Sequence, residues 1–213
     1  MKAWMLGLLV VLVSGCTMPK KEIRDVRLLK SVSVVVSAPT PAFIRCGGVA
    51  VSPFHVVTAH HCVWNEKINR PEFWVGIVTQ GERRVTMKII YMDPTNDIAV
   101  LSTEGKHKFQ RWAQLADDSF VGEDVTMISG HYNGELLAPS FGRVSVIATP
   151  HIRKGAFFDV IVGVVWGGMS GGGVFNSLGE LVGIVSMRST EYSIGYTASL
   201  KSVRKALKKV GVL

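Results

Sequence analysis

The chain has 213 residues, of which 47% are hydrophobic and 19% are charged, and this composition excludes an intrinsically disordered protein. It is long enough to bury a sizeable core in one large domain or two small ones. The net charge of +8 permits an anionic partner. The basic residues gather at 20–30 and 201–209, however, and no basic strand carries the interleaved aromatic residues that stack nucleic-acid bases. We therefore expect no nucleic-acid partner.

The N-terminus predicts export from the cell. An apolar run at residues 3–13 has the length of a signal-peptide core and is too short to span a bilayer. The run leads into VSGC, which resembles the lipobox of bacterial lipoproteins and implies removal of residues 1–15 and lipidation of Cys16, with palmitate among the acyl chains. Several acyl chains hold a protein firmly on a membrane. An ordinary cleaved signal peptide is the alternative.

This resemblance implies a location in the bacterial cell envelope. The protein would be anchored in the lipid membrane through Cys16, on the periplasmic face of the inner or outer membrane or at the cell surface. Three cysteines in an exported protein leave one without a disulfide partner. If Cys16 carries lipid, Cys46 and Cys62 remain. They can form a disulfide in an oxidising compartment, which stabilises a fold by about 3 kcal/mol for a loop of about 15 residues.

Residues 16–30 are short, charged and without clear period, which indicates a lipidated tether in front of a folded domain. From residue 31 onward, period-two alternation and β-rich runs between turn residues predict short strands. The predicted strands cover residues 31–37, 49–51, 56–58, 73–78, 85–89, 98–101, 125–128, 143–146, 157–165, 173–175, 181–186 and 194–197. About a dozen strands with no helical period between them predict an all-β barrel or sandwich.

The polar stretch at 106–118 lies between two sets of predicted strands and is expected to link an N-terminal half, residues 31–112, to a C-terminal half, residues 113–213. The chain ends in a predicted amphipathic helix with Ser199 or Ser202 as its N-cap. Its apolar positions recur at helical spacing: Leu200, Val203, Leu207 and Val210. We expect a packed helix with a solvated basic face, and a membrane-surface role for that face is the alternative.

The stretch WGGMSGGGVF at 166–175 places Ser170 among five glycines. Glycine destabilises regular elements, so such a cluster needs a local reason. A flexible loop is one reason. The other is a turn that directs backbone N–H groups at a developing negative charge. A serine hydroxyl is a weak nucleophile unless a base takes its proton, and that base needs an orienting partner.

Candidates for the base and its partner are present. His60 and His61 follow the predicted strand at 56–58, and Asp97 precedes the apolar strand at 98–101. A carboxylate directly before an apolar strand is partly buried. Its burial costs free energy unless it has a hydrogen-bond partner such as an imidazole N–H. Asp93 is followed by a proline, which is typical of a turn residue.

These motifs resemble those of the trypsin-like (chymotrypsin-fold) serine endopeptidases. The order His, Asp, Ser is the one found in chymotrypsin-type triads. The matching stretches are CGG at 46–48, VVTAHHC at 56–62, NDIAVL at 96–101, GMSGG at 168–172 and LVGIVS at 181–186. The resemblance covers about residues 31–210. It implies two six-stranded Greek-key β-barrels with the active site between them, a C-terminal α-helix, and a disulfide beside the catalytic histidine.

The resemblance also assigns roles to residues. His61 would be the base, because the family's histidine immediately precedes the cysteine, and His60 is a departure from the usual small residue. Adjacent side chains on an extended backbone point apart, so both imidazoles can hardly face the serine. Asp97 would orient His61, Ser170 would be the nucleophile, and the N–H groups of Gly168 and Ser170 would form the oxyanion hole.

Met169 departs from the many relatives that carry an aspartate there, which pairs with a newly cleaved N-terminus. Methionine cannot form that ion pair. We therefore expect an enzyme that needs no zymogen cleavage, closer to the bacterial V8-like and Deg-like branches.

The family's spacing places Val164 at the base of the primary specificity pocket, with Ile194 on its far wall. The edge of the pocket would be formed by Ser186, Met187 and Arg188. No carboxylate lies at the base, which favours an uncharged side chain before the cut, while Arg188 at the rim leaves an acidic preference open.

The resemblance implies a polypeptide substrate and no cofactor, and we expect a monomer. The remaining histidines lack the clustered spacing of a metal site, so no metal is expected. They are His55, His107, His131 and His151. The alternative to a peptidase is a catalytically silent protease-like binding protein or a surface-exclusion lipoprotein.

Overall fold

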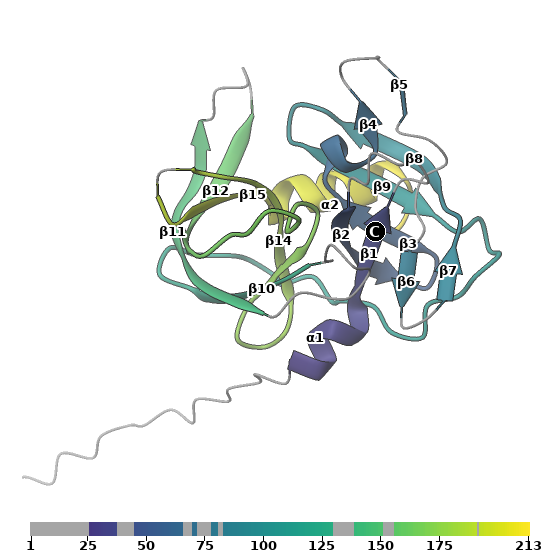
Figure 1. Cartoon of the computed structure of the whole chain (residues 1–213), viewed down its shortest axis with the longest axis horizontal. Helices are drawn as coiled ribbons and strands as arrows, with labels where there is room; N and C mark the ends of the chain where they lie inside the picture. The colour runs from purple at the N-terminus through teal and green to yellow at the C-terminus, as the bar shows by residue number, and fades with distance from the viewer. Residues whose placement is uncertain are drawn as a thin grey trace, which may run out of the picture.

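The computed structural model describes residues 26–37, 45–65, 70–71, 78–80, 83–129, 139–150, 156–190 and 192–213. Strands fill two halves that lie side by side in Figure 1. The predicted strands that fall within the described residues are found there with their ends shifted by a few residues, apart from the one at 85–89, which is split between two strands. The predicted strand at 73–78 lies outside the described residues except for Val78.

The N-terminal half is a seven-stranded sheet in the order β7-β6-β1-β2-β3-β9-β8. Only two residues of the chain separate β7 from β8, and these strands pair with β6 and β9 respectively. These two strands, which are adjacent in sequence, therefore lie at opposite ends of the sheet. The bounds are β1 Ser33–Ser37, β2 Arg45–Ser52, β3 His55–Thr58, β6 Val78–Gln80, β7 Arg83–Val85, β8 Lys88–Asp93 and β9 Ile98–Ser102, with a small separate ladder of β4 Trp64–Asn65 and β5 Arg70–Pro71.

The C-terminal half is a closed barrel of six strands in the order β10-β11-β12-β15-β14-β13, which confirms the predicted C-terminal barrel. Its neighbouring strands pair antiparallel all round the barrel. The bounds are β10 Asp124–Ile128, β11 Ser140–Pro150, β12 Phe157–Gly163, β13 Gly173–Phe175, β14 Leu181–Arg188 and β15 Ile194–Ser199.

The segment between β9 and β10, which includes the polar stretch at 106–118, joins the two halves. Its backbone is hydrogen-bonded to both halves. Ala113 N–H donates to the carbonyl of Ala50 in β2 at 2.8 Å, and the carbonyl of Gln114 accepts from Leu181 N–H in β14 at 2.8 Å. The connection therefore holds the two halves together as well as linking them in sequence.

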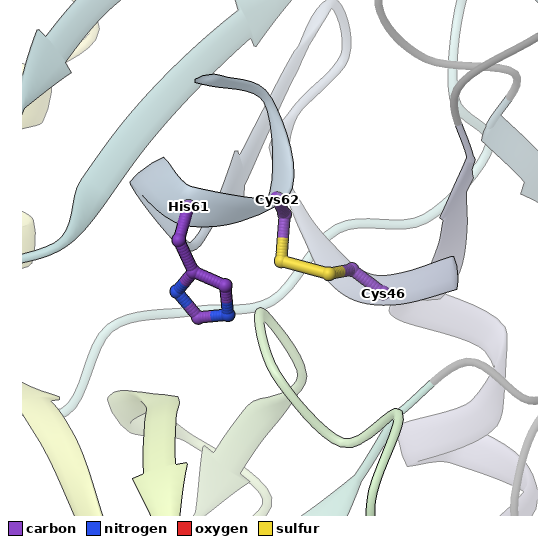
Figure 2. Close-up of side chains that lie close together, drawn as sticks. All are labelled: Cys46, His61 and Cys62. Atoms are coloured by element: carbon purple, nitrogen blue, oxygen red, sulfur yellow. A yellow bond between two sulfur atoms is a disulfide. The ribbon is translucent and has the colours of Figure 1, made fainter. Parts of the chain in front are cut away.

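A disulfide joins Cys46 in β2 to Cys62 in the 3-10 turn η1, His60–Cys62, as predicted. Figure 2 shows it directly beside the ring of His61. Both cysteines are buried, at 2% and 4% exposed. The bond thus ties the turn that carries His61 to the neighbouring strand.

Removing this bond is expected to destabilise the fold. Replacing both residues, Cys46→Ala with Cys62→Ala, should lower the free energy of unfolding by about 3 kcal/mol, because the unfolded chain regains the freedom of the closed loop. Chemical denaturation of the variant and the parent under non-reducing conditions measures the difference. The parent under reducing conditions is the control and should approach the variant. Equal midpoints for the oxidised parent and the variant would contradict the prediction.

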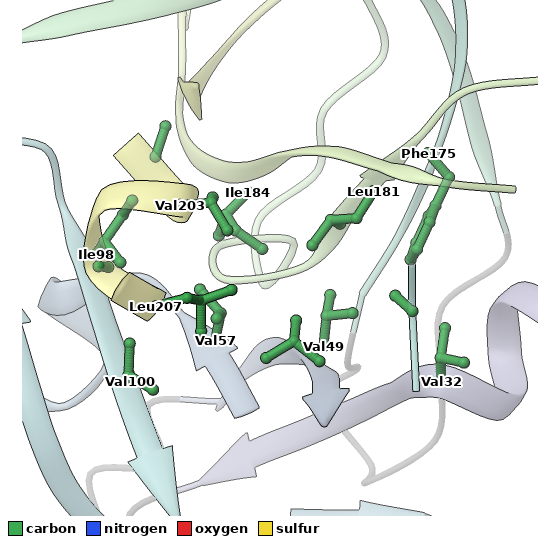
Figure 3. Close-up of a cluster of buried hydrophobic side chains, with 14 of the residues drawn as sticks. Val32, Val49, Val57, Ile98, Val100, Phe175, Leu181, Ile184, Val203 and Leu207 are labelled. Carbon is green, nitrogen blue, oxygen red and sulfur yellow. The ribbon is translucent and has the colours of Figure 1, made fainter. Parts of the chain in front are cut away.

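A single cluster of buried apolar side chains lies between the two halves (Figure 3). It draws residues from both halves and from the helices α1, Val26–Val32, and α2, Leu200–Lys209. Burial of apolar area stabilises such a cluster by roughly 25 cal/mol per Å². Its members include Leu29, Val32, Val49, Val57, Val100, Phe175, Leu181, Ile184, Val203 and Leu207. The relative placement of the halves, and of any site between them, therefore rests on this shared core.

The C-terminal helix is present as predicted, and Ser199 is its N-cap. The Ser199 hydroxyl accepts a hydrogen bond from Ser202 N–H at 3.3 Å. The apolar positions Leu200, Val203 and Leu207 are buried. Its lysines lie on the exposed face, so the helix packs by its apolar stripe.

Helix α1 corrects the predicted boundary between tether and domain. The tether was expected to extend to residue 30, but Leu29 and Val32 are only 3% and 5% exposed and pack into the shared core. Ser33 Oγ donates to the carbonyl of Leu29 at 2.8 Å and satisfies one of the carbonyls at the helix end. Three apolar residues at a spacing of three, within one short charged segment, give too little periodicity to recognise.

Within the described residues, no helix combines the length and the apolar character needed to cross a membrane. The predicted signal sequence at 1–15, Cys16 and the predicted tether up to residue 25 lie outside the described residues. The lipid anchor therefore stays a prediction.

Candidate active site

The imidazole of His61 is positioned by the tight turn that follows β3. Cys62 N–H donates to the carbonyl of Ala59 at 3.1 Å, which closes the 3-10 turn η1. The His61 side chain is 34% exposed. His60 is 2% exposed, and its ring stacks on Trp64 with centroids 6.2 Å apart. The backbone here is a 3-10 turn and not the extended chain assumed from sequence, yet the two rings still have separate surroundings.

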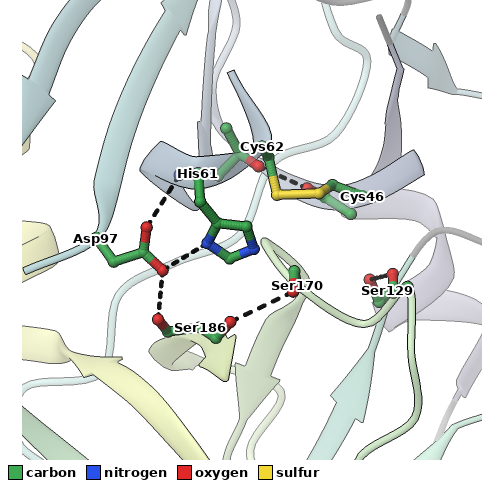
Figure 4. Close-up of a disulfide and its surroundings, with 10 residues drawn as sticks. Cys46, His61, Cys62, Asp97, Ser129, Ser170 and Ser186 are labelled. Atoms are coloured by element: carbon green, nitrogen blue, oxygen red, sulfur yellow. Dashed lines mark hydrogen bonds and ion pairs between the residues drawn. A yellow bond between two sulfur atoms is a disulfide. The ribbon is translucent and has the colours of Figure 1, made fainter. Parts of the chain in front are cut away.

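Asp97 lies in the turn before β9, and its side chain is fully buried, at 0% exposed. Its Oδ2 accepts from His61 Nδ1 at 2.8 Å, and its Oδ1 accepts from His61 backbone N–H at 3.0 Å. Ser186 Oγ donates a further hydrogen bond to Oδ2. The carboxylate is therefore fixed from two sides (Figure 4).

The backbone of Asp97 has φ of +54°, the left-handed region that non-glycine residues enter at a cost of roughly 1–3 kcal/mol. Aspartate tolerates this region better than most residues. The hydrogen bonds to His61 and Ser186 offset that cost, and the strained turn directs the carboxylate at the imidazole.

Burial raises the pKa of Asp97, but the hydrogen bond and charge of His61, the hydroxyl of Ser186 and the His61 backbone N–H together lower it further than burial raises it. The net pKa lies below the ordinary value for aspartate. An ionised carboxylate accepts from Nδ1–H, so Nε2 of His61 remains free to accept a proton.

This lowered pKa predicts how stability responds to acid. Because the folded-state pKa lies below the unfolded value of about 3.9, the ionised group stabilises the fold above that pH, and this stabilisation is lost as the pH falls through the folded-state pKa. The difference in unfolding free energy between the parent and Asp97→Asn should therefore be largest near neutral pH and shrink in acid. Denaturation curves across the acid range at constant ionic strength measure this, with reversibility checked by refolding. A difference that is constant with pH would contradict it.

Ser170 lies in the glycine-rich turn between β12 and β13. Its hydroxyl donates to the backbone carbonyl of Ser186 at 3.3 Å, so Ser186 bridges Ser170 and Asp97. Figure 4 shows the His61 ring between Asp97 and the loop that carries Ser170. Among the hydrogen bonds of the described residues, none joins Ser170 Oγ to His61. Catalytic hydrogen bonds are often long or misaligned in ligand-free enzymes and tighten when substrate binds.

The residues before Ser170 form a tight turn that requires glycine. Met169 N–H donates to the carbonyl of Trp166 at 3.2 Å, and Gly168, the third residue of this turn, has φ of +91°. A β-turn with a positive φ at its third position favours glycine there. The positive φ of Gly168 is thus a local reason for glycine at this position.

Two backbone amides of this turn stay free. Within the part of the chain that the structure describes, Gly168 N–H and Ser170 N–H donate to no protein acceptor, whereas Gly171 N–H donates to the carbonyl of Val185 at 2.7 Å. Uncommitted N–H groups that flank a serine hydroxyl are suited to bind an oxyanion. These are the two amides that the sequence assigns to the oxyanion hole.

The glycines after Ser170 allow the two halves to approach closely. Gly47 N–H in β2 donates to the carbonyl of Ser170 at 2.7 Å. A Cβ on Gly171 would lie 2.2 Å from the Gly47 carbonyl oxygen and 2.3 Å from Thr58 Oγ1, and its φ is +78°. A side chain at Gly171 would therefore push the serine turn away from the half that carries His61.

The residues assigned to the specificity pocket have mixed surroundings. Ser186 is buried, Met187 and Ile194 are half-buried, and Arg188 is exposed. Val164 is 43% exposed, which is more than the base of a closed pocket would be. Nothing in the sequence indicated that Ser186 also bonds Asp97, because that contact depends on the tertiary fold.

Two aromatic side chains that lie near the assigned pocket residues in the sequence are exposed. Trp166 immediately precedes the oxyanion turn and is 58% exposed, and Tyr192, just before β15, is 67% exposed.

The potential ligand atoms of Cys46, His61 and Cys62 lie within 4.8 Å of one another. In the structure the two sulfur atoms are bonded to each other, so neither is a thiolate that could ligate a metal. This group therefore fits a disulfide beside an imidazole and does not fit a metal site.

Known proteins resemble this chain in sequence and in fold. Residues 46–184 match the family described as trypsin-like peptidase domain. Uncharacterized protein y4bJ of Sinorhizobium fredii (strain NBRC 101917 / NGR234) is 28% identical over 156 residues, which are 71% of this chain and 24% of that protein. The chain thus spans about a quarter of the length of this curated relative.

Solved structures share the fold. The active form of the Rv3671c protease from M. tuberculosis superposes with a TM-score of 0.73 at 20% identity, over 88% of this chain and 84% of that one. The serine endoprotease from Yersinia pestis gives a TM-score of 0.69 at 23% identity, over 87% of this chain and 64% of that one. Both likenesses show the chymotrypsin-like two-barrel architecture.

Proposed function

Because the chain belongs to the trypsin-like peptidase family, we propose that it is a serine endopeptidase with Ser170 as nucleophile, His61 as general base and Asp97 as the group that orients His61. The observation that carries this proposal is the pair of hydrogen bonds that one buried carboxylate accepts from the side chain and backbone of His61, at 2.8 and 3.0 Å, beside a serine turn with two uncommitted amides.

The proposed reaction proceeds by acyl-enzyme formation. When a peptide binds, the Ser170 hydroxyl rotates from the Ser186 carbonyl toward His61, and its proton passes to Nε2 as Oγ bonds to the scissile carbonyl carbon. Gly168 and Ser170 N–H donate to the resulting oxyanion, each contributing about 3 kcal/mol. His61 then protonates the leaving amine as the C–N bond breaks, and water hydrolyses the acyl-enzyme by the reverse sequence.

We propose that the residue before the cut is uncharged. Val164 and Ile194 supply apolar surface where the resemblance places the pocket, and the exposed ring of Trp166 adds more beside the serine turn. Cleavage of a peptide library tests this, with small or medium uncharged residues expected at that position. A profile dominated by arginine or lysine would overturn it, and an acidic profile would assign the exposed Arg188 the leading role.

We also propose that the enzyme is anchored in a bacterial envelope membrane through lipid on Cys16. The described domain begins at Val26, so the nine intervening residues would hold it within at most about 35 Å of the anchor. Incorporation of a palmitate analogue, lost in Cys16→Ser, is the expected result. A mature protein with an unmodified Cys16 thiol would contradict the anchor and leave an ordinary signal peptide.

The peptidase assignment is tested by labelling the folded protein with a fluorophosphonate probe and locating the adduct by mass spectrometry. We expect the adduct on Ser170, together with hydrolysis of peptides. A folded protein that is not labelled would overturn the proposal and favour a catalytically silent binding or surface-exclusion lipoprotein.

A further inference from the structure

We propose that Met169 is a positioning residue, whose side chain anchors the oxyanion turn from inside the C-terminal barrel so that the site is assembled without a released N-terminus. This inference rests on the proposed peptidase function. It concerns how the turn that carries Gly168 and Ser170 is held before substrate arrives.

The side chain of Met169 is part of the barrel core. It is 0% exposed and belongs to a cluster of apolar residues from the barrel interior, including Val165, Val174 and Val185. Methionine fills irregular space in cores because its side chain is unbranched and adaptable. The residue between the two oxyanion donors is therefore fixed by packing.

The Met169 side chain also closes the turn. Its Sδ accepts a hydrogen bond from Trp166 N–H at 3.2 Å, while its own N–H donates to the Trp166 carbonyl at 3.2 Å. The two ends of the four-residue turn are thus joined by a reciprocal pair of contacts, one of which uses the thioether. A sulfur acceptor makes a weak hydrogen bond, so burial carries most of the anchoring and the sulfur adds direction.

A second contact holds the turn from the other side. Ser129, directly after β10, is 0% exposed, and its hydroxyl donates to the Gly168 carbonyl at 3.1 Å. These contacts fix Gly168 and Met169, so Gly168 keeps its positive φ. The Gly168 N–H then takes no part in the hydrogen bond that closes the turn. The free amides are therefore pre-organised, which is the condition for electrostatic stabilisation of an oxyanion.

This arrangement leaves no role for a cationic N-terminus at residue 169. The side chain of Met169 carries no carboxylate and packs among apolar residues of the barrel, so an ammonium group would find no ion-pair partner in residue 169. The turn is instead held by contacts that the folded chain already contains.

Met127 provides a matched control, because it is another methionine at 0% exposure in the same cluster, on β10. Met169→Ala should reduce both kcat and the rate of fluorophosphonate labelling by about 10²-fold, the scale of losing one oxyanion donor, with KM nearly unchanged. Met127→Ala should lose comparable thermal stability and keep kcat within about threefold of the parent. Met169→Leu keeps the buried volume but lacks the sulfur, so its loss should be smaller, about tenfold or less.

Equal kcat values for Met169→Ala and Met127→Ala would overturn the inference, as would a fall in kcat that simply follows the loss of stability in both. If Met169→Ala does not fold, Met169→Leu and Met127→Leu decide by the same comparison. Parent protein that is labelled only after a protease trims the residues before α1 would also overturn it. Failure of the folded parent to react at all is a separate result, which contradicts the proposed peptidase function.

Discussion

Replacing His61 by alanine is expected to lower kcat by about 10⁶-fold, because loss of the base alone disables a triad nearly as fully as loss of all its members. The fold should survive, since the His61 side chain is 34% exposed. Turnover of a peptide substrate, with circular dichroism to confirm folding, measures the effect.

His60 is the matched control for this experiment, because it is the adjacent histidine in the same 3-10 turn. It is 2% exposed and stacks on Trp64, so His60→Gln should cost stability while kcat stays within about tenfold of the parent. If His60→Gln were inactive and His61→Ala active, the roles of the two histidines would be reversed. If both variants were inactive although folded, the expectation that His60 is dispensable for turnover would be wrong.

Most of the fold could be predicted from the sequence because its strands carry local signals. Alternating or β-branched runs between turn residues locate β2, β3, β9, β10 and β12 to β15 within a few residues. Two features lacked such a signal. The predicted strand at 85–89 is divided into β7 and β8, and α1 is too short for its period to be recognised beside its charged neighbours.

The candidate site likewise has residues that the sequence indicates and a contact that it does not. His61, Asp97 and Ser170 each lie within a short motif whose chemistry can be recognised one segment at a time. The hydroxyl and carbonyl of Ser186 join Asp97 to Ser170. The contact between Asp97 and Ser186 spans 89 positions in the sequence and exists only after the chain has folded. The sequence assigned Ser186 to the pocket edge, and its contact with the carboxylate could not be inferred from spacing.

The contacts of Met169 also could not be predicted from the sequence. The sequence shows only that methionine cannot form the ion pair of its relatives. Burial of its side chain in the barrel and the contact of its sulfur with Trp166 N–H depend on how β12 and β13 enclose the turn. The methionine in the motif therefore excludes an ion pair as the contact that fixes the oxyanion turn. The packing of its side chain in the barrel fixes the turn instead.

The second large effect is expected for Asp97→Asn, which should lower kcat by about 10⁴-fold at neutral pH while His61 and Ser170 stay in place. The ionised carboxylate holds His61 as the tautomer with a proton on Nδ1. An amide in its place can direct an N–H at Nδ1, which leaves the imidazole proton on Nε2 and removes the acceptor for the serine proton. The loss should fall on kcat, with KM for a peptide substrate changed little.

Asp93→Asn is the matched control, since Asp93 lies four residues earlier and is also hydrogen-bonded. Its two carboxylate oxygens accept from the backbone N–H and the side-chain amide of Asn96, at 3.1 and 2.9 Å, as a turn residue's would. Its replacement should leave kcat within about threefold of the parent. Comparable losses in both variants would mean that the turn as a whole matters and the orientation of His61 does not. A loss confined to Asp97→Asn, with unchanged folding by circular dichroism, assigns the effect to the carboxylate that contacts the imidazole.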